Sequence, residues 1–498
     1  MSSTIRNIAI ESWPRIEAEG IGGRGWKARN DGFFASAARM DAIGENPHAA
    51  GTMGDDTTDL DPISSCSARS TSAEAADREG RNTFWMECYL IAVRIGWIFK
   101  TETIIMPAVL DAVVDSGLLR GLLPVLNRGG QSVPPLLAAG AVARRPRKKW
   151  PLVATSLAMA GCFAVLALAW QPLRQARSDL LALLFLVVYA TFSAVIGVNQ
   201  LVVAALQGKL ISPGHRGRAL VVSVTIGSVL AIVAALVLLG PWLREPDGFP
   251  KIFAATAVFF AVAAIAPVFL DEPADAVPAA DATPRRSSCR AARDGLAAWR
   301  TTVAGDRALV RLSLVAACFS AVLMLFPHYQ AFARDRLGGG GGSLLVWVCT
   351  QNAATGLASL VAGPASDRRG TKLVLVWLVA LSAITPLVAT ALSLVPHAVA
   401  IDWFWIVYVP LGLNPLTLKL FTNYALELAP TAADHPRYVS IVGAAMAVPF
   451  VVSPLAGLAV DVLGFRPVFL LGAAVIAAGA AVALRLPEPR IRADRAVA

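Results

Sequence analysis

The chain has 498 residues, of which 56% are hydrophobic and only 16% are charged. A soluble domain carries about 25% charged residues, and a soluble protein of this composition would expose more apolar helix surface than it could cover. The net charge of +10 would favour nucleic-acid binding in a soluble protein, but here the basic residues lie in loops between apolar runs, a pattern typical of membrane topology.

A polar segment precedes the apolar part of the chain. Residues 1–83 are rich in Ala, Ser, Asp, Gly and Thr and show no sustained hydrophobic period, so we expect a disordered cytoplasmic tail. An unused upstream extension from a misassigned start is the alternative interpretation. The first 30 residues contain no apolar h-region, so no secretory signal peptide is predicted.

Apolar runs of the length that crosses a hydrocarbon core, about 20 residues, recur from Leu90 to Leu486. We predict an all-α membrane protein of about twelve transmembrane helices in two six-helix bundles, at 84–270 and 307–486, with a cytoplasmic linker at 271–306 and a cytoplasmic tail at 487–498. The first six helices are expected at about 90–114, 122–142, 150–170, 180–206, 219–239 and 252–270. The second six are expected at about 309–332, 344–362, 373–394, 403–426, 439–460 and 468–484.

Basic residues divide unevenly between the two sets of loops. The loops after the second, fourth, sixth, eighth and tenth helices contain nineteen Lys and Arg residues, against eight in the opposite loops. Because cytoplasmic loops carry the excess of Lys and Arg, we predict that both termini and the linker face the cytoplasm, in the plasma (inner) membrane.

The two halves of the chain share short motifs. After the second and eighth helices three positions align at a constant offset of 223 residues: Gly140 with Gly363, Arg145 with Arg368, and Lys149 with Lys372. In the fourth and tenth helices, Gly197-Val-Asn199 corresponds to Gly412-Leu-Asn414. Parallel six-helix halves related by an axis along the membrane normal are a known transporter architecture.

With these motifs the chain resembles the major facilitator superfamily of transporters, over roughly residues 85–485. The loop signature of that family is Gly, three residues, Asp, a basic residue, any residue, Gly and further basic residues, and the second-half loop matches it with Gly363, Asp367, Arg368, Gly370 and Lys372. The first-half loop departs from it, because Arg144 replaces the acid and Arg147 the second glycine. A related pattern ends the eleventh helix, with Gly457, Asp461, Gly464 and Arg466.

The resemblance implies a role for these loops as a conformational latch that clamps the outward-open state during alternating access. With Arg144 in place of the acid, we expect the first-half copy, with Gly140 and Arg145, to be a weaker latch or to make different contacts. The alternative is that the basic residues only set the topology.

Helix 1 carries the charges Arg94, Lys100, Glu102 and Asp111. A charge near the bilayer centre costs about 2.5 to 3.5 kcal/mol on insertion scales, so each calls for a partner or a function. Lys100 and Glu102 are about 200° apart on an ideal helix and are expected to be poor partners for each other. Glu102 or Asp111 is a candidate proton carrier, and a structural ion pair is the alternative for both.

Polar side chains on other helices are candidates for contacting a solute. Arg128 and Gln131 share a face of helix 2, and the planar guanidinium suits a carboxylate or phosphate; an ion pair with an acid of helix 1 is the alternative. By the resemblance, helices 1, 4, 7 and 10 line the central cavity, which adds four amides and a phenol: Asn199, Gln200, Tyr329, Gln330 and Asn414. Helix–helix hydrogen bonds are the alternative for the amides. Lys419 is expected to snorkel toward the cytoplasm.

These observations predict a secondary active, proton-coupled transporter of a small solute that works by alternating access. No GxxxxGK[ST] loop, CxxC pair or cluster of metal ligands occurs in the sequence, so we expect no cofactor, no metal and no enzymatic activity. The expected partners are a small-molecule solute, a proton and the lipid bilayer, with no nucleic acid and with a monomeric chain. A transporter-fold protein that acts as a sensor or partner subunit without transport is the alternative.

Overall fold

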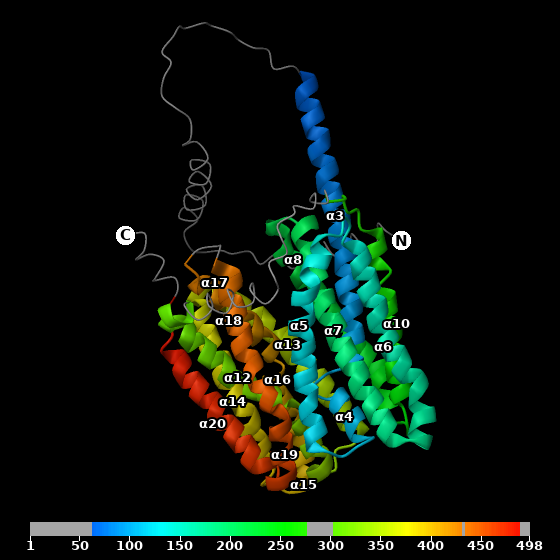
Figure 1. Ribbon diagram of the computed structural model, residues 1–498, viewed down its shortest axis with the longest axis vertical. Helices are drawn as coiled ribbons and strands as arrows, with labels where there is room; N and C mark the ends of the chain where they lie inside the picture. The colour runs from blue at the N-terminus through cyan, green and yellow to red at the C-terminus, as the bar shows by residue number, and fades with distance from the viewer. Residues whose placement is uncertain (1–61, 276–301, 431–433, 489–498) are drawn as a thin grey trace, which may run out of the picture. The chain divides into compact units, whose positions relative to one another are not determined.

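The computed structural model describes residues 62–275, 302–430 and 434–488 (Figure 1). The chain divides into two units at Arg69, and the second unit, which begins at Ser70, contains the two helical bundles. Throughout the described ranges the regular structure is helical. The rest of the expected tail, linker and C-terminal tail lies outside these ranges.

The first half forms six spanning segments, several of them built from two or three pieces. They are α3 (Pro62–Phe99) with α4 (Ile105–Asp111), α5 (Gly117–Ala143), α6 (Lys149–Ala176), α7 (Ser178–Leu210), α8 (Pro213–Ala234) with η1 (Ala235–Leu239) and α9 (Gly240–Arg244), and α10 (Phe249–Ala263) with η2 (Ala266–Phe269).

The second half repeats this count with six further segments, and Figure 1 shows α12, α14 and α20 grouped apart from α6, α7 and α10. They are α12 (Arg307–Leu337), α13 (Gly341–Arg369), α14 (Thr371–Leu392), α15 (His397–Trp403) with η3 (Phe404–Val407), α16 (Tyr408–Leu411) and α17 (Asn414–Leu428), then α18 (His435–Ala447) with η5 (Val448–Val452) and α19 (Ser453–Leu463), and α20 (Phe465–Leu484). The predicted fold class is confirmed.

The repeated Gly-x-Asn motifs make equivalent contacts in the two bundles. A Cβ atom on Gly197 of α7 would lie 2.7 Å from the Gly130 carbonyl oxygen of α5, and one on Gly412 would lie 2.5 Å from the Gln351 carbonyl oxygen of α13. Both distances are shorter than real side chains allow, so glycine is what permits each pair of helices to approach so closely. The internal repeat is therefore a repeat of packing as well as of sequence.

The first span differs from the continuous helix expected at 90–114. The helix ends at Phe99 and resumes at Ile105, and between them the Thr101 carbonyl accepts the amides of Ile105 and Met106 at 2.9 and 3.1 Å. The Thr101 hydroxyl also donates to the Ile98 carbonyl at 2.9 Å. Thr155 makes the same kind of bond inside the unbroken helix α6, so the hydroxyl bond of Thr101 accompanies the break and is not its cause. The described end of the expected tail also differs, because α3 already begins at Pro62.

Prolines lie at the breaks in two spans of the second half. The tenth span breaks between Pro410 and Pro415, and the eleventh passes into a 3-10 turn at Val448–Val452, beside Pro449 and Pro454. By contrast, α5 runs as one helix through Pro134 and Pro135.

Ten helices of the described chain are long and apolar enough to cross a membrane. The two spans outside this set are α3 with α4, and α5, which carry the charges Arg94, Lys100, Glu102, Arg120 and Arg128. Polar residues in spanning helices face the bundle interior or a water-filled cavity, so these two spans mark where a functional site is to be sought.

Candidate functional site

The two bundles meet closely at one end, where α5 begins and α19 ends. The Gly117 amide donates to both carboxylate oxygens of Asp461, at 3.0 and 2.9 Å. A Cβ atom on Gly457 would lie only 1.9 Å from the Gly117 carbonyl oxygen. A carboxylate at a helix N-terminus is favoured by the orphan amides and the helix dipole, so Asp461 joins the bundles here. We call this end of the molecule the Asp461 end.

A charged cluster reinforces the Asp461 end. Arg120 of α5, which is 3% exposed, donates to Asp111 and Asp115 at 2.9 Å each. Arg334 of α12, in the other bundle, pairs with the same two carboxylates at 3.2 and 2.7 Å. Asp111 is thus shared by an arginine from each bundle, which matches the structural ion pair that was the alternative to a proton carrier.

The other end of the first bundle is held together differently, and we call it the basic end, defined by Lys148, Lys149 and Lys209. All three contact the carboxylate of Glu272, which is 4% exposed: the amides of Lys148 and Lys149 donate to it at 2.8 Å, and Lys209 Nζ donates at 2.9 Å. Each of these contacts lies within the first bundle, in contrast to the Asp461 end.

A cavity of about 610 Å³ lies between the bundles, on the side of the Asp461–Gly117 contact that faces the basic end. Its walls come from both halves of the chain, and a volume between about 300 and 1,000 Å³ suits a small-molecule ligand. The polar and charged side chains that line it are Arg94, Thr101, Glu102, Thr103, Arg128, Gln131, Gln200, Ser223, Gln351, Asn352, Thr355, Asn414 and Lys419.

Lys100 and Glu102 form an ion pair at the break in the first span. Lys100 Nζ donates to Glu102 Oε1 at 2.6 Å, and it also lies 3.6 Å from the centroid of the Trp97 ring. Lys100 is fully buried behind the cavity wall, whereas the Glu102 side chain is 23% exposed and lines the cavity. The expectation that the two are poor partners is therefore wrong, because it assumed a continuous helix and the chain leaves the helix after Phe99.

Arg128 and Gln131 line the same cavity from α5, as their shared helical face predicts. Arg128 lies 5.9 Å from the centroid of the Phe450 ring, a residue of the second bundle. Gln131 Nε2 donates to Asn127 Oδ1 at 2.9 Å, so its own carbonyl is left for another partner.

The two asparagines of the repeat have different environments. Asn199 accepts from the Tyr89 hydroxyl at 2.8 Å and donates to Thr155 Oγ1 at 2.9 Å, within the first bundle, which matches its helix-bonding alternative. Asn414 is 2% exposed and accepts only a long 3.5 Å bond from Ser382, and its Nδ2 has no partner among the described residues. Of the pair, Asn414 lines the cavity, as does the neighbour of Asn199, Gln200.

Tyr329 and Gln330 lie away from the cavity in this conformation. They are 0% and 3% exposed within α12, toward the Asp461 end, and Tyr329 packs on Phe469 with ring centroids 4.9 Å apart. The Tyr329 hydroxyl and Gln330 Oε1 have no hydrogen-bond partner in the described chain, and neither do the ring nitrogens of the adjacent His328.

Comparisons with known proteins agree with this architecture. Residues 337–498 match the family model described as Major Facilitator Superfamily. No curated protein matches the chain. Among solved structures, the chain is similar to a POT family transporter in complex with 5-aminolevulinic acid, with a TM-score of 0.61 at 13% identity, covering 83% of this chain and 96% of the other.

Two further solved structures give the same result. A D-xylose–proton symporter aligns with a TM-score of 0.59 at 14% identity, covering 81% of this chain and 98% of the other. The nucleoside transporter NupG aligns with a TM-score of 0.56 at 12% identity, with the same two coverages. The chain has the major facilitator fold. The fold that the resemblance in the loop motifs implied is confirmed.

The signature loops of the major facilitator fold lie at the basic end. In the first half, Glu272 caps the start of α6 by accepting the Lys148 and Lys149 amides, close to Gly140 and Arg145 along the chain. In the second half, Gly370 has φ +92° between α13 and α14, and a Cβ atom there would lie 2.7 Å from Glu488 Oε1. The side chains of Asp367 and Arg368 lie outside the part that the structure describes.

The sequence reading missed these two glutamates, although a signal was present. Glu272-Pro273 begins three residues after the sixth span ends at Phe269, and Glu488-Pro489 begins four residues after the twelfth ends at Leu484. An acid at the same place in both halves, next to a loop whose amides begin a helix, is a repeat of the kind already used for Gly197 and Gly412.

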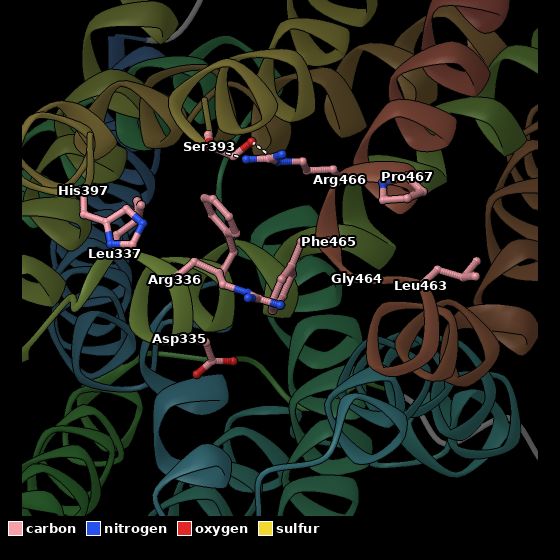
Figure 2. A pocket seen from close by; sticks show the side chains of 11 residues that line it. Asp335, Arg336, Leu337, Ser393, His397, Leu463, Gly464, Phe465, Arg466 and Pro467 are labelled. Atoms are coloured by element: carbon pink, nitrogen blue, oxygen red, sulfur yellow. Dashed lines mark hydrogen bonds between the residues drawn. The ribbon is translucent and has the colours of Figure 1, made fainter. Parts of the chain in front are cut away.

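A second hollow, of about 490 Å³, lies at the Asp461 end (Figure 2). Figure 2 shows Arg466 reaching Ser393, and its Nε donates to Ser393 Oγ at 2.7 Å. The residues around this hollow come only from the second bundle: Phe332, Asp335, Arg336, Leu337, Ser393, His397, Leu463, Gly464, Phe465, Arg466 and Pro467. Because a site for alternating access needs walls from both halves, the cavity that holds Arg128 and Glu102 is the candidate functional site.

Proposed function

We propose that this chain is a secondary active transporter that moves a small solute across the plasma (inner) membrane by alternating access, coupled to a proton gradient. One observation carries the proposal: a cavity lined by both bundles and sealed at one end by Asp461, Gly117 and the Arg120 cluster. A site near the repeat interface that is reached from one side at a time is what alternating access requires.

The charge distribution supports an orientation for this state. The basic end carries the loops that are rich in Lys and Arg, so by the positive-inside rule it faces the cytoplasm, as do both termini. The Asp461 end then faces outward, and the conformation is inward-facing. In the outward-facing state, the loop with Gly363, Asp367, Arg368, Gly370 and Lys372 would serve as the latch.

Glu102 is our candidate for the proton site. It is the acidic side chain of the cavity lining, and its partner Lys100 is buried behind it. A proton on Glu102 would cancel the ion pair at the break in the first span, where the backbone is already released from the helix. Protonation at this point would therefore alter the local structure that joins α3 to α4.

The remaining candidates divide between the two states of the cycle. Arg128, Gln131, Gln200 and Asn414 contact the solute in the inward-facing cavity. Tyr329 and Gln330, which are buried without hydrogen-bond partners, become available when the Asp461 end opens. Asn199 serves helix packing, and the chain acts as a monomer.

Distance measurements on both ends test the proposal without knowledge of the solute. Spin labels are placed on Leu118 and Leu463 at the Asp461 end, and on Arg145 and Arg369 at the basic end; all four side chains are exposed. Double electron–electron resonance in nanodiscs, on a chain whose six cysteines are replaced, should give two distance populations for each pair. The populations should change reciprocally between pH 5.5 and pH 7.5.

The variant Glu102→Gln tests whether the pH response depends on Glu102, separately from whether the bundles move. We expect reciprocal populations that no longer respond to pH in this variant. Fixed distances at both ends under every condition would contradict alternating access and favour the sensor or partner-subunit function. Reciprocal distances that still respond to pH in Glu102→Gln would move the proton site elsewhere.

A further inference from the structure

The charges of the cavity do not balance. Its lining includes the cations Arg94, Arg128 and Lys419 and one carboxylate, Glu102. Glu102 is already engaged by Lys100 at 2.6 Å, a cation that lies behind the wall. Across the described parts of the chain, no ion pair within 4 Å involves any of the three lining cations.

Two of these cations come from opposite bundles. Arg94 belongs to α3 and Lys419 to α17, and both side chains line the cavity. Arg94 is half-buried and Lys419 is exposed. A cavity lined by charges of one sign attracts counter-ions from outside.

Arg94 is held in place and does not extend freely to solvent. Its Nε donates to Ser228 Oγ at 3.0 Å, and its Cδ is the atom nearest to a Cβ built on Gly227, at 3.0 Å. Both contacts are to α8, and they fix the stem and one nitrogen of the side chain. The two terminal guanidinium nitrogens make no hydrogen bond within the described chain, so they are available to a ligand.

Asn414 adds an independent observation to the same cavity. It lines the wall, is 98% buried, and its Nδ2 donor has no partner among the residues that the structure describes. A buried donor without an acceptor is rare and costs free energy unless a ligand or water supplies one. Besides the free carbonyl of Gln131, the unused groups of the cavity therefore include a buried donor, Asn414 Nδ2, and three positive charges.

We propose that the transported solute is an organic anion, whose carboxylate or phosphate group binds between Arg94 and Lys419 and so bridges the two bundles. Acceptor oxygens match the free donors of Arg94, Lys419, Arg128 and Asn414, and the planar guanidinium of Arg94 suits a bidentate contact. An anion bound by both cations links α3 to α17 and draws the bundles together. This inference rests on the proposed function, because it names the substrate class of the same cavity.

Matched pairs of solutes test the charge requirement. The full chain in detergent is unfolded thermally with succinate, benzoate or glucose 6-phosphate, each beside its uncharged counterpart succinamide, benzamide or glucose, at constant ionic strength. A ligand that binds the folded state raises Tm with concentration. We expect at least one anion to raise Tm by several degrees and its neutral counterpart to leave it unchanged.

Variants that remove one cation test where the anion binds. Arg94→Gln and Lys419→Gln should each weaken the dissociation constant of that anion at least tenfold. Without ligand, each should have a Tm close to that of the wild type, because neither cation has an ion-pair partner to lose among the described residues. Lys251→Gln, an exposed cation paired with Glu245 away from the cavity, is the matched control and should bind as the wild type does.

Three outcomes would overturn the proposal. One is stabilisation by neutral solutes alone or to the same degree as by anions, and another is the absence of a shift with every anion. The third is unchanged anion binding in both Arg94→Gln and Lys419→Gln. Each leaves the distance measurements of alternating access untouched, so the transport function can stand while the anionic substrate fails. Anion binding with fixed distances would instead contradict transport.

Discussion

The Asp461 end and the cavity both place charges in the protein interior, but they treat them in opposite ways. At the Asp461 end each buried or half-buried arginine has carboxylate partners, and one of them, Asp111, is shared between Arg120 and Arg334 from different bundles. In the cavity, Arg94, Arg128 and Lys419 have none within 4 Å among the described residues.

This difference separates two tasks. Paired charges across an interface stabilise one arrangement of the bundles, because separating them would leave a buried charge without a partner. Unpaired charges around a cavity stabilise nothing by themselves and attract a counter-charge from outside. The Asp461 end thus determines the conformation, and the cavity determines what binds.

The largest effect is expected when the shared carboxylate is removed. Asp111→Asn leaves Arg120, which is 3% exposed, without its buried partner. Loss of one member of a buried pair costs about 3 to 5 kcal/mol, so we expect a marked shift of the Leu118–Leu463 distance to the open population. Asp115→Asn is the control, since that carboxylate is 66% exposed and such pairs contribute about 1 kcal/mol or less. Equal shifts in the two variants would mean that the cluster does not hold the end closed.

A second large effect is expected at the ion pair between Lys100 and Glu102, beside the cavity. Glu102→Gln leaves the buried Lys100 without a partner and should lower stability by about 2 to 3 kcal/mol, less than a fully buried pair because Glu102 is 23% exposed. The double variant Lys100→Met with Glu102→Gln removes both charges and should recover most of the loss. Thermal unfolding of the wild type, the two single variants and the double variant gives the coupling energy between Lys100 and Glu102. Additive losses would show that the 2.6 Å contact is not a stabilising pair.

Much of the fold could be predicted from the sequence, because spanning helices are set by length and hydrophobicity. The 6+6 organisation and the Gly197–Gly412 repeat were both available from the residues alone. What could not be predicted depends on local breaks and on contacts across the bundles. The Lys100–Glu102 pair exists because the helix ends at Phe99, and the geometry of a continuous helix argued against it.

The residues of the candidate site also divide into those that the sequence predicts and those that only the structure shows. Arg128, Gln131, Gln200, Asn414 and Glu102 were found by asking which polar residues lie in spanning helices, and all of them line the cavity. The partners Asp461 and Gly117 are 344 residues apart, and periodicity does not predict such a contact. Lys419 was expected to snorkel to the cytoplasm, and the structure shows that its exposed side chain lines the same cavity as Arg94.

A smaller effect is expected from the close contact at the Asp461 end. Gly457→Ala puts a methyl group where the Gly117 carbonyl oxygen lies at 1.9 Å, so the helices must separate. Overpacking costs about 1 to 3 kcal/mol, and the higher helix propensity of Ala offsets about 1 kcal/mol of it. Gly443→Ala in α18 is the control, because nothing lies within 4 Å of its Cβ position. The Leu118–Leu463 distance should lengthen in the first variant alone, and lengthening in both would point to a general loosening of the eleventh span.

The smallest expected effect is a change in thermal stability at acid pH when Asp115 is replaced. Burial alone would raise the pKa of Asp115, but the hydrogen bond and charge of Arg334, together with Arg120, outweigh burial and hold that pKa below its ordinary value. A depressed carboxyl pKa contributes stability that is present above the unfolded value, about 3.9, and is lost as pH falls through the folded value. The Tm difference between the wild type and Asp115→Asn should therefore stay constant above about pH 5 and shrink below about pH 4. Because Asp115 is exposed, the difference should be on the order of 1 °C, and a difference that grows in acid would mean that the arginines do not depress this pKa.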